Sequence, residues 1–138
     1  MSTGVDNCGG MPSVSLVSQA TEALRLGDSA ADAFEARAPS SARLSEQFSE
    51  VVERLDVAGS LIALEGPEEV ANEAGEVITE LHSWANALDI AIAVREGRHT
   101  FPSELWSVPS LEELVEDGER SHEAVATFTA NCRSLLDC

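Results

Sequence analysis

The stretch from Pro67 to Gly97, PEEVANEAGEVITELHSWANALDIAIAVREG, carries the longest uninterrupted helical pattern in the chain. Its apolar residues recur at alternating spacings of four and three, which places them on one face of a helix. Proline suits a first helical position, the two glutamates after it favour the N-terminal dipole, and Gly97 can end the helix in a left-handed conformation. The stretch therefore predicts a core-facing helix of about eight turns. The predicted inward residues are Val70, Ala71, Ala74, Val77, Ile78, Leu81, Trp84, Ala85, Leu88, Ala91 and Ile92.

A first helix is expected from Ser13, as its N-cap, to a point before Pro39, because proline disfavours helical geometry in the residue that precedes it. Its sequence Gly27-Asp28-Ser29 either weakens the helix or divides it in two. The main apolar stripe is predicted at Val14, Val17, Thr21 and Leu24, with Leu16, Ala20 and Ala23 beside it.

A second helix is expected from Ser40 or Ser41 to Gly66, with an apolar stripe from Leu44 to Ile62. It ends directly before Pro67, where the next helix begins. So short a connection predicts a tight antiparallel hairpin, and a continuous kinked helix is the alternative.

The last predicted helix opens with Ser110-Leu111-Glu112-Glu113, which has the Ser-x-x-Glu form of a capping box. It extends nearly to the C-terminus. Glycines on the helix faces, namely Gly59, Gly75 and Gly118, are expected to let neighbouring helices approach closely. The predicted inward face of this helix is Leu111, Leu114, Val115, Gly118, Val125, Phe128, Cys132, Leu135 and Leu136.

Four amphipathic helices predict an all-α fold: an up-down-up-down antiparallel four-helix bundle that forms a single domain over residues 13–138. Residues 1–12 are rich in Gly, Ser, Asn and Asp and show no periodicity, so they predict a flexible, disordered N-terminal tail. The one longer connection, residues 98–109, holds Phe101 and Trp106. It is interpreted either as a loop folded across the open end of the bundle or as an exposed patch where these two side chains bind a partner.

The 138-residue chain has a formal net charge of −17 and contains no lysine; its eight basic side chains are all arginines. Nucleic-acid backbones and anionic membranes are themselves negative, so the charge argues against both as partners. A solvated exterior that keeps a small bundle soluble accounts for much of this charge. A basic protein partner, a cation and mimicry of nucleic acid are all compatible with this charge.

The three cysteines, Cys8, Cys132 and Cys138, are an odd number without regular spacing, so they predict neither a disulfide framework nor a zinc site. No basic region followed by an apolar run marks a signal peptide, and no apolar run is long enough to span a bilayer. A cytoplasmic location is the resulting expectation. No motif calls for a cofactor.

Glu119 and His122 have the Glu-x-x-His spacing that di-metal carboxylate bundles place on two of their helices. A second copy is needed and is absent, because Thr79 rather than an acid precedes His82 by three residues. His122 is instead expected at the edge of the core, packed on Trp84, so no metal ligand is assigned; a metal-binding bundle around His122 is the third hypothesis.

His82 is expected off the apolar stripe of its helix, between Leu81 and Trp84, which point inward. The string Leu81-His82-Ser83-Trp84-Ala85-Asn86-Ala87-Leu88 resembles the phospho-accepting helix of sensor-kinase dimerisation domains, in which Asn or Thr follows the histidine at the fourth position and an inward Leu at the sixth. The family's acid after the histidine and its proline are replaced here by Ser83 and Ala87. Stand-alone histidine-phosphotransfer domains are similar in size and helix number. These resemblances imply that His82 accepts a phosphoryl group and that Asn86 orients its ring.

The sequence thus favours a non-enzymatic role in protein–protein binding, of a regulatory, adaptor or inhibitor type. Self-association as a homodimer is compatible with it. A phosphorelay protein with His82 as phospho-acceptor is the alternative. The loop residues Phe101 and Trp106 are the predicted binding residues.

Overall fold

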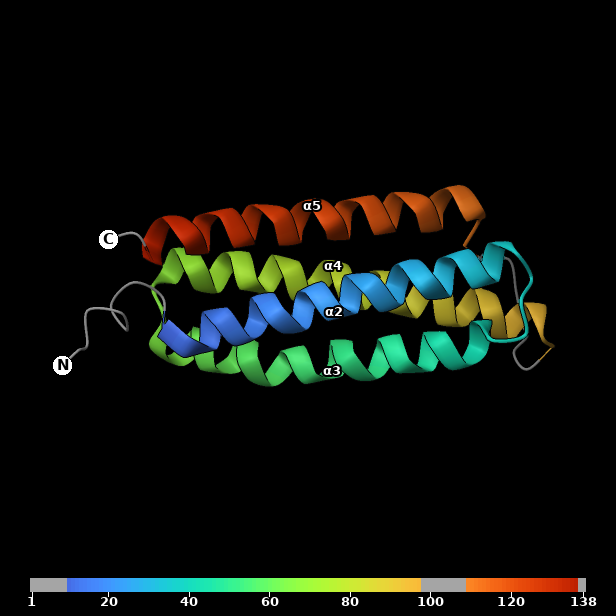
Figure 1. Ribbon diagram of the computed structural model, residues 1–138, viewed down its shortest axis with the longest axis horizontal. Coiled ribbons are helices and arrows are strands. Elements are labelled where there is room, and N and C mark those ends of the chain that lie inside the picture. The colour runs from blue at the N-terminus through green and yellow to red at the C-terminus, as the bar shows by residue number, and fades with distance from the viewer. Residues whose placement is uncertain (1–9, 98–108, 137–138) are drawn as a thin grey trace, which may run out of the picture.

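The computed structural model describes residues 10–97 and 109–136, and its four helices form an antiparallel bundle (Figure 1). Successive helices run up, down, up and down, and α2 and α5 close the bundle. The predicted all-α four-helix architecture is therefore confirmed. None of the described helices is long and apolar enough to cross a membrane. The helices are α2 (Gly10–Glu35), α3 (Ser41–Glu65), α4 (Glu68–Arg95) and α5 (Leu111–Leu136).

The start of α2 differs from the prediction, because the helix begins at Gly10 and Ser13 lies inside it. Pro12 is tolerated there, since the first N–H groups of a helix have no partner within the helix and proline loses nothing by lacking one. Residues 1–9 of the predicted tail lie outside the described part of the chain. At Gly27 the helix continues without a break, so Gly27-Asp28-Ser29 does not divide it in two.

The inward face of α2 also differs from the predicted stripe. Leu16, Ala20 and Ala23 are fully buried, whereas Val14 and Thr21 are exposed. The reason lies further along the helix. The buried residues continue at helical spacing to Gly27, Ala30 and Phe34, which are buried as well. The predicted stripe continues at the same spacing to Asp28, whose carboxylate is exposed.

The predicted helix ends are close to those observed. Gly66 and Pro67 are both extended, so α3 and α4 form a hairpin rather than one kinked helix, with Pro67 as N-cap instead of first helical residue. Gly97 follows α4 with a left-handed φ of 77°. Ser110 and Glu113 form both bonds of the predicted capping box: each backbone N–H donates to the other residue's side chain, at 3.0 and 3.1 Å.

Trp84 of α4 is the largest fully buried side chain and lies at the centre of the core. Phe48 of α3 meets its indole edge-on, with ring centroids 5.0 Å apart and planes at 73°. Gly27 of α2 and Gly118 of α5 lie directly against the six-membered ring of the indole. Because neither glycine has a side chain, the space between α2 and α5 is large enough for this ring.

Alanine substitutions at these two glycines test this packing. The Cβ of Gly27→Ala would lie 2.5 Å from Cζ3 of Trp84, and that of Gly118→Ala 2.9 Å from Cζ2. Overpacking of this kind costs about 1–3 kcal/mol, so we expect both variants to lower the free energy of unfolding in urea.

Gly75→Ala is the matched control, because nothing lies within 4 Å of the added Cβ. There the better helix propensity of alanine should raise the free energy of unfolding by about 0.5–1 kcal/mol. Gly75 was expected to permit helix contact and does not, since it faces outward. Equal stabilisation by all three substitutions would contradict the proposed role of Gly27 and Gly118.

Candidate functional site

An open groove of about 430 Å³ runs between α2 and α5. We call it the α2/α5 groove. Volumes of about 300–1,000 Å³ are typical of ligand pockets, so it is large enough to receive one or two side chains of a partner. Its lining comprises Asp28, Ala31, Asp32, Phe34 and Glu35 of α2, Trp84 of α4, and Leu111, Leu114, Val115, Gly118, Glu119, His122 and Glu123 of α5.

The floor of the groove is apolar. Trp84 reaches it from α4, because Gly27 and Gly118 leave the indole room between α2 and α5. The indole is 2 % exposed, and its Nε1 has no hydrogen-bond partner among the described residues. Leu111 and Val115 extend the apolar surface and are 48 % and 54 % exposed. Both were predicted to face the core; instead they line the open seam, because α5 packs less extensively on α2 than on α4.

Carboxylates line both walls of the groove. Asp28, Asp32 and Glu35 stand on α2, and Glu119 and Glu123 stand one turn apart on α5. Neither arginine nor lysine contributes to the lining. Of these five acids, only Asp28 takes part in an ion pair within the described residues. The walls therefore present a concentrated negative potential around an apolar floor.

The partner of Asp28 is His122, whose Nε2 lies 3.0 Å from both carboxylate oxygens. Its ring is tilted by 56° to the Trp84 indole, with centroids 6.2 Å apart, close to where the sequence placed it. The interaction joins residues 94 positions apart and connects the two walls. The described residues include no group of three or more His, Cys, Asp or Glu side chains arranged to hold a metal ion, so Glu119 and His122 form no such centre there.

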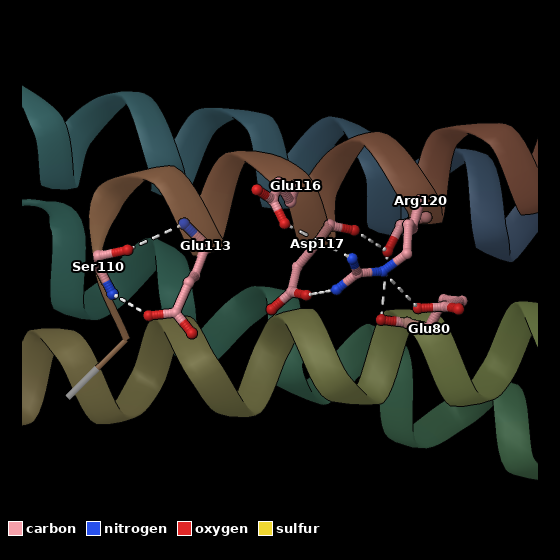
Figure 2. A network of polar contacts seen from close by, with 7 residues as sticks. Glu80, Ser110, Glu113, Glu116, Asp117 and Arg120 are labelled. Carbon is pink, nitrogen blue, oxygen red and sulfur yellow. Dashed lines mark hydrogen bonds and ion pairs between the residues drawn. The ribbon is translucent and has the colours of Figure 1, made fainter. Parts of the chain in front are cut away.

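The opposite side of α5 is fixed to α4 by polar contacts (Figure 2). Arg120 points toward Glu80 on α4, with Nε 3.5 Å from Oε1, and also contacts Asp117 and Glu116 of its own helix. The hydroxyl of Ser121 is shared between the backbone oxygens of Asp117, at 2.9 Å, and Glu80, at 3.2 Å. These acids share an arginine, whereas those of the groove do not.

Burial raises the pKa of the Asp117 carboxyl above its ordinary value. The Arg120 guanidinium opposes this rise, and Glu80 and Glu113 add to it. A raised pKa in the folded state means that ionised Asp117 disfavours folding. That penalty is present at neutral pH and disappears as the pH falls below the ordinary aspartate value of about 3.9.

We therefore expect Asp117→Asn to increase the free energy of unfolding at pH 7, with an advantage that narrows toward pH 4. Urea unfolding at several pH values measures it. Glu116→Gln is the control, because Glu116 is 58 % exposed and lies 4.0 Å from Arg120, against 13 % exposure for Asp117. A less stable Asp117→Asn protein at pH 7 would mean that the contact with Arg120 outweighs burial.

The other predicted site residues lie elsewhere. The His82 side chain is 37 % exposed on α4, and its Nε2 lies 3.1 Å from Oδ1 of Asp56 on α3. Asn86 is exposed, and the described hydrogen bond of the His82 ring is with Asp56 instead. The predicted binding residues Phe101 and Trp106 lie outside the described residues. The structure thus separates His82 from the groove, which holds His122.

Sequence reasoning missed the groove, although it singled out some of its residues. It placed His122 beside Trp84 and assigned Leu111 and Val115 to an apolar face. The sequence feature that could have revealed the groove is the width of the apolar face of α5. Leu111, Leu114 and Val115 together cover a wider part of the helix surface than packing against the core requires. Which acids of α2 lie opposite them could not be read from spacing.

Comparisons with protein-family models, with curated proteins and with solved structures find no match to this chain. The functional interpretation therefore depends on the chemistry of the groove itself. Concave shape, exposed apolar side chains and carboxylates without a cation are together suited to bind a positively charged, partly apolar group.

Proposed function

We propose that this protein acts without catalysis, as a regulatory, adaptor or inhibitor-type module that binds a basic segment of another protein in the α2/α5 groove. The observation that carries the proposal is the set of carboxylates around an apolar floor, four of which have no ion-pair partner among the described residues. Charge of this sign steers a basic partner toward the groove and repels nucleic acid and anionic lipid.

The apolar floor is what distinguishes the groove from the rest of an acidic surface. Exposed ion pairs contribute little by themselves, because water and salt screen them. Leu111 and Val115 offer apolar area that a partner can cover, and an interface gains most of its affinity from such desolvated contacts. In this proposal the carboxylates determine which partner approaches, and the floor holds it.

Neutralisation of the groove tests the proposal. The variant Asp32→Asn/Glu119→Gln/Glu123→Gln removes three charges that have no described ion-pair partner. The control Glu46→Gln/Glu50→Gln/Glu53→Gln removes three exposed charges from α3 and changes the net charge equally. Each protein serves as bait in affinity capture, and the protein enriched by the wild type is then purified and titrated.

We expect the groove variant to bind that protein about tenfold more weakly, the equivalent of 1.4 kcal/mol, and the control to bind it nearly as well as the wild type. Binding to the wild type should also weaken as salt rises. Binding that is insensitive to salt, or equal losses in both variants, would contradict a groove that acts through its charges.

A second candidate function is acceptance of a phosphoryl group by His82. One contact favours it: the half-exposed ring is held by the carboxylate of Asp56, beside the exposed side chain of Val57. Phosphotransfer needs an accessible imidazole nitrogen, a group that orients it and an apolar surface for the partner.

Incubation with phospho-donor kinases or phosphorylated receiver proteins tests this function. We expect acid-labile phosphate on the wild type, none on His82→Gln, and an unchanged amount on the control His122→Gln. Labelling that persists in His82→Gln, or its absence from the wild type, would exclude His82 as the acceptor.

A further inference from the structure

We infer that the α2/α5 groove selects arginine: the bound segment inserts a guanidinium group between the carboxylate walls, next to an aliphatic side chain that covers Leu111 and Val115. This inference depends on the proposed function and makes it more specific. A merely acidic surface would accept arginine and lysine alike, whereas two features of the groove favour the planar cation, and the charge of the whole chain favours its supply by another protein.

The first feature is an exposed planar ring beside the apolar floor. Trp84 and Phe34 belong to that floor and are only 2 % and 6 % exposed, whereas the His122 side chain is 47 % exposed, so the ring accessible to a bound cation is that of His122. A guanidinium group is planar and weakly hydrated, so it can stack on a ring while its N–H groups pair with a carboxylate. An ammonium group is compact and strongly hydrated, and it gains less from an apolar floor.

The protein itself contains one example of such stacking at the end of the groove. The guanidinium carbon of Arg95 lies 3.5 Å from the centroid of the Phe34 ring, and its Nη1 donates to the backbone oxygen of Phe34. Arg95 is not part of the groove lining, although Phe34 is. A contact between guanidinium and aromatic ring is thus already part of this fold.

The second feature is the position of His122. Its imidazole is a planar nitrogen-bearing ring that contacts Asp28 at 3.0 Å and lies beside the indole of Trp84. A guanidinium group has the same requirements: a carboxylate in its plane and a ring nearby. Asp32 stands one turn from Asp28, and Glu119 and Glu123 stand on the opposite wall, so several carboxylates can receive its N–H groups.

The third feature is the charge of the chain as a whole. A second copy carries the same net charge of −17, which disfavours its docking into an acidic groove. The volume of about 430 Å³ also lies near the lower end of ligand pockets, which suits one long side chain with a small aliphatic neighbour. An arginine-containing peptide segment from another protein fits both constraints.

Three capped peptides of equal length and equal leucine content test the inference. One carries two arginines, one two lysines, and one two citrullines, which keep the shape of arginine without its charge. The full chain with Trp106→Phe is titrated, so that Trp84 is its only tryptophan and reports occupancy of the groove by fluorescence. Isothermal titration calorimetry provides an independent readout.

We expect the arginine peptide to bind about fivefold more tightly than the lysine peptide, as a stacked cation implies, and more tightly still than the citrulline peptide. This preference should disappear in Asp32→Asn/Glu119→Gln/Glu123→Gln and persist in Glu46→Gln/Glu50→Gln/Glu53→Gln. Circular dichroism verifies that all variants remain helical.

The other outcomes separate this inference from the proposed function. Equal binding of the arginine and lysine peptides, both tighter than citrulline, would overturn arginine selection and leave an acidic binding groove. No preference for either cationic peptide over citrulline would overturn both. A preference for arginine that the control variant removes and the groove variant retains would place the site on α3 and overturn the groove.

Discussion

The bundle depends on one packing arrangement, the Trp84 indole held between Gly27 and Gly118. A tryptophan that points from α4 into the core needs more space than two neighbouring helices with side chains would leave. Both glycines remove that obstacle at the same level of the bundle. Because protein interiors are close-packed and yield little, the ring then fixes the separation of α2 and α5. The floor of the α2/α5 groove is thus a direct result of how the core is packed.

The polar contacts of α5 are distributed unevenly between its two neighbours, α4 and α2. Arg120 and Ser121 join α5 to Glu80 of α4, and Asn131 donates to Glu73 of the same helix. Across the groove, the described polar contact between side chains of α5 and α2 is the half-exposed pair of His122 and Asp28. An exposed pair of this kind contributes little to stability. The described polar contacts between α5 and its neighbours are therefore concentrated on its α4 side, and the α2/α5 groove lies on the side with fewer of them.

The sequence predicted a helix correctly where several independent features of the same segment agreed. In α4 the stripe from Val70 to Ile92, the acidic first turn and Gly97 all agreed, and the helix formed within one residue of the predicted start. The prediction was wrong in α2, where the fully buried stripe is formed by Leu16, Ala20 and Ala23, which the sequence analysis placed beside the main stripe of Val14, Val17, Thr21 and Leu24. Both stripes have helical spacing, so spacing alone did not identify the inward face. Only the path through Gly27 to Phe34 identifies the correct one, and that requires knowing that Trp84 lies opposite.

The site was less predictable than the fold, because it is assembled from residues far apart in the chain. His82 and Asn86 attracted attention through a local string, yet the contact of His82 is with Asp56, 26 residues away. The net charge favoured a basic partner but carried no information about where on the surface such a partner would bind. Asp28 and His122 become neighbours only through the antiparallel order of the helices. Spacing along one helix carries no information about such a pair.

Arginine is present among the acids on one side of α5 and absent from the lining of the α2/α5 groove on the other side. Around Arg120, one guanidinium serves Glu80, Glu116 and Asp117, so mutual repulsion among these acids is partly relieved. Asp32, Glu35, Glu119 and Glu123 line the groove without an ion-pair partner among the described residues. Carboxylates gathered without a cation are a local departure of the kind expected at functional sites. A cation supplied from outside would meet unpaired carboxylates here, whereas those around Arg120 already have one, which is the physical reason to place the proposed partner in this groove.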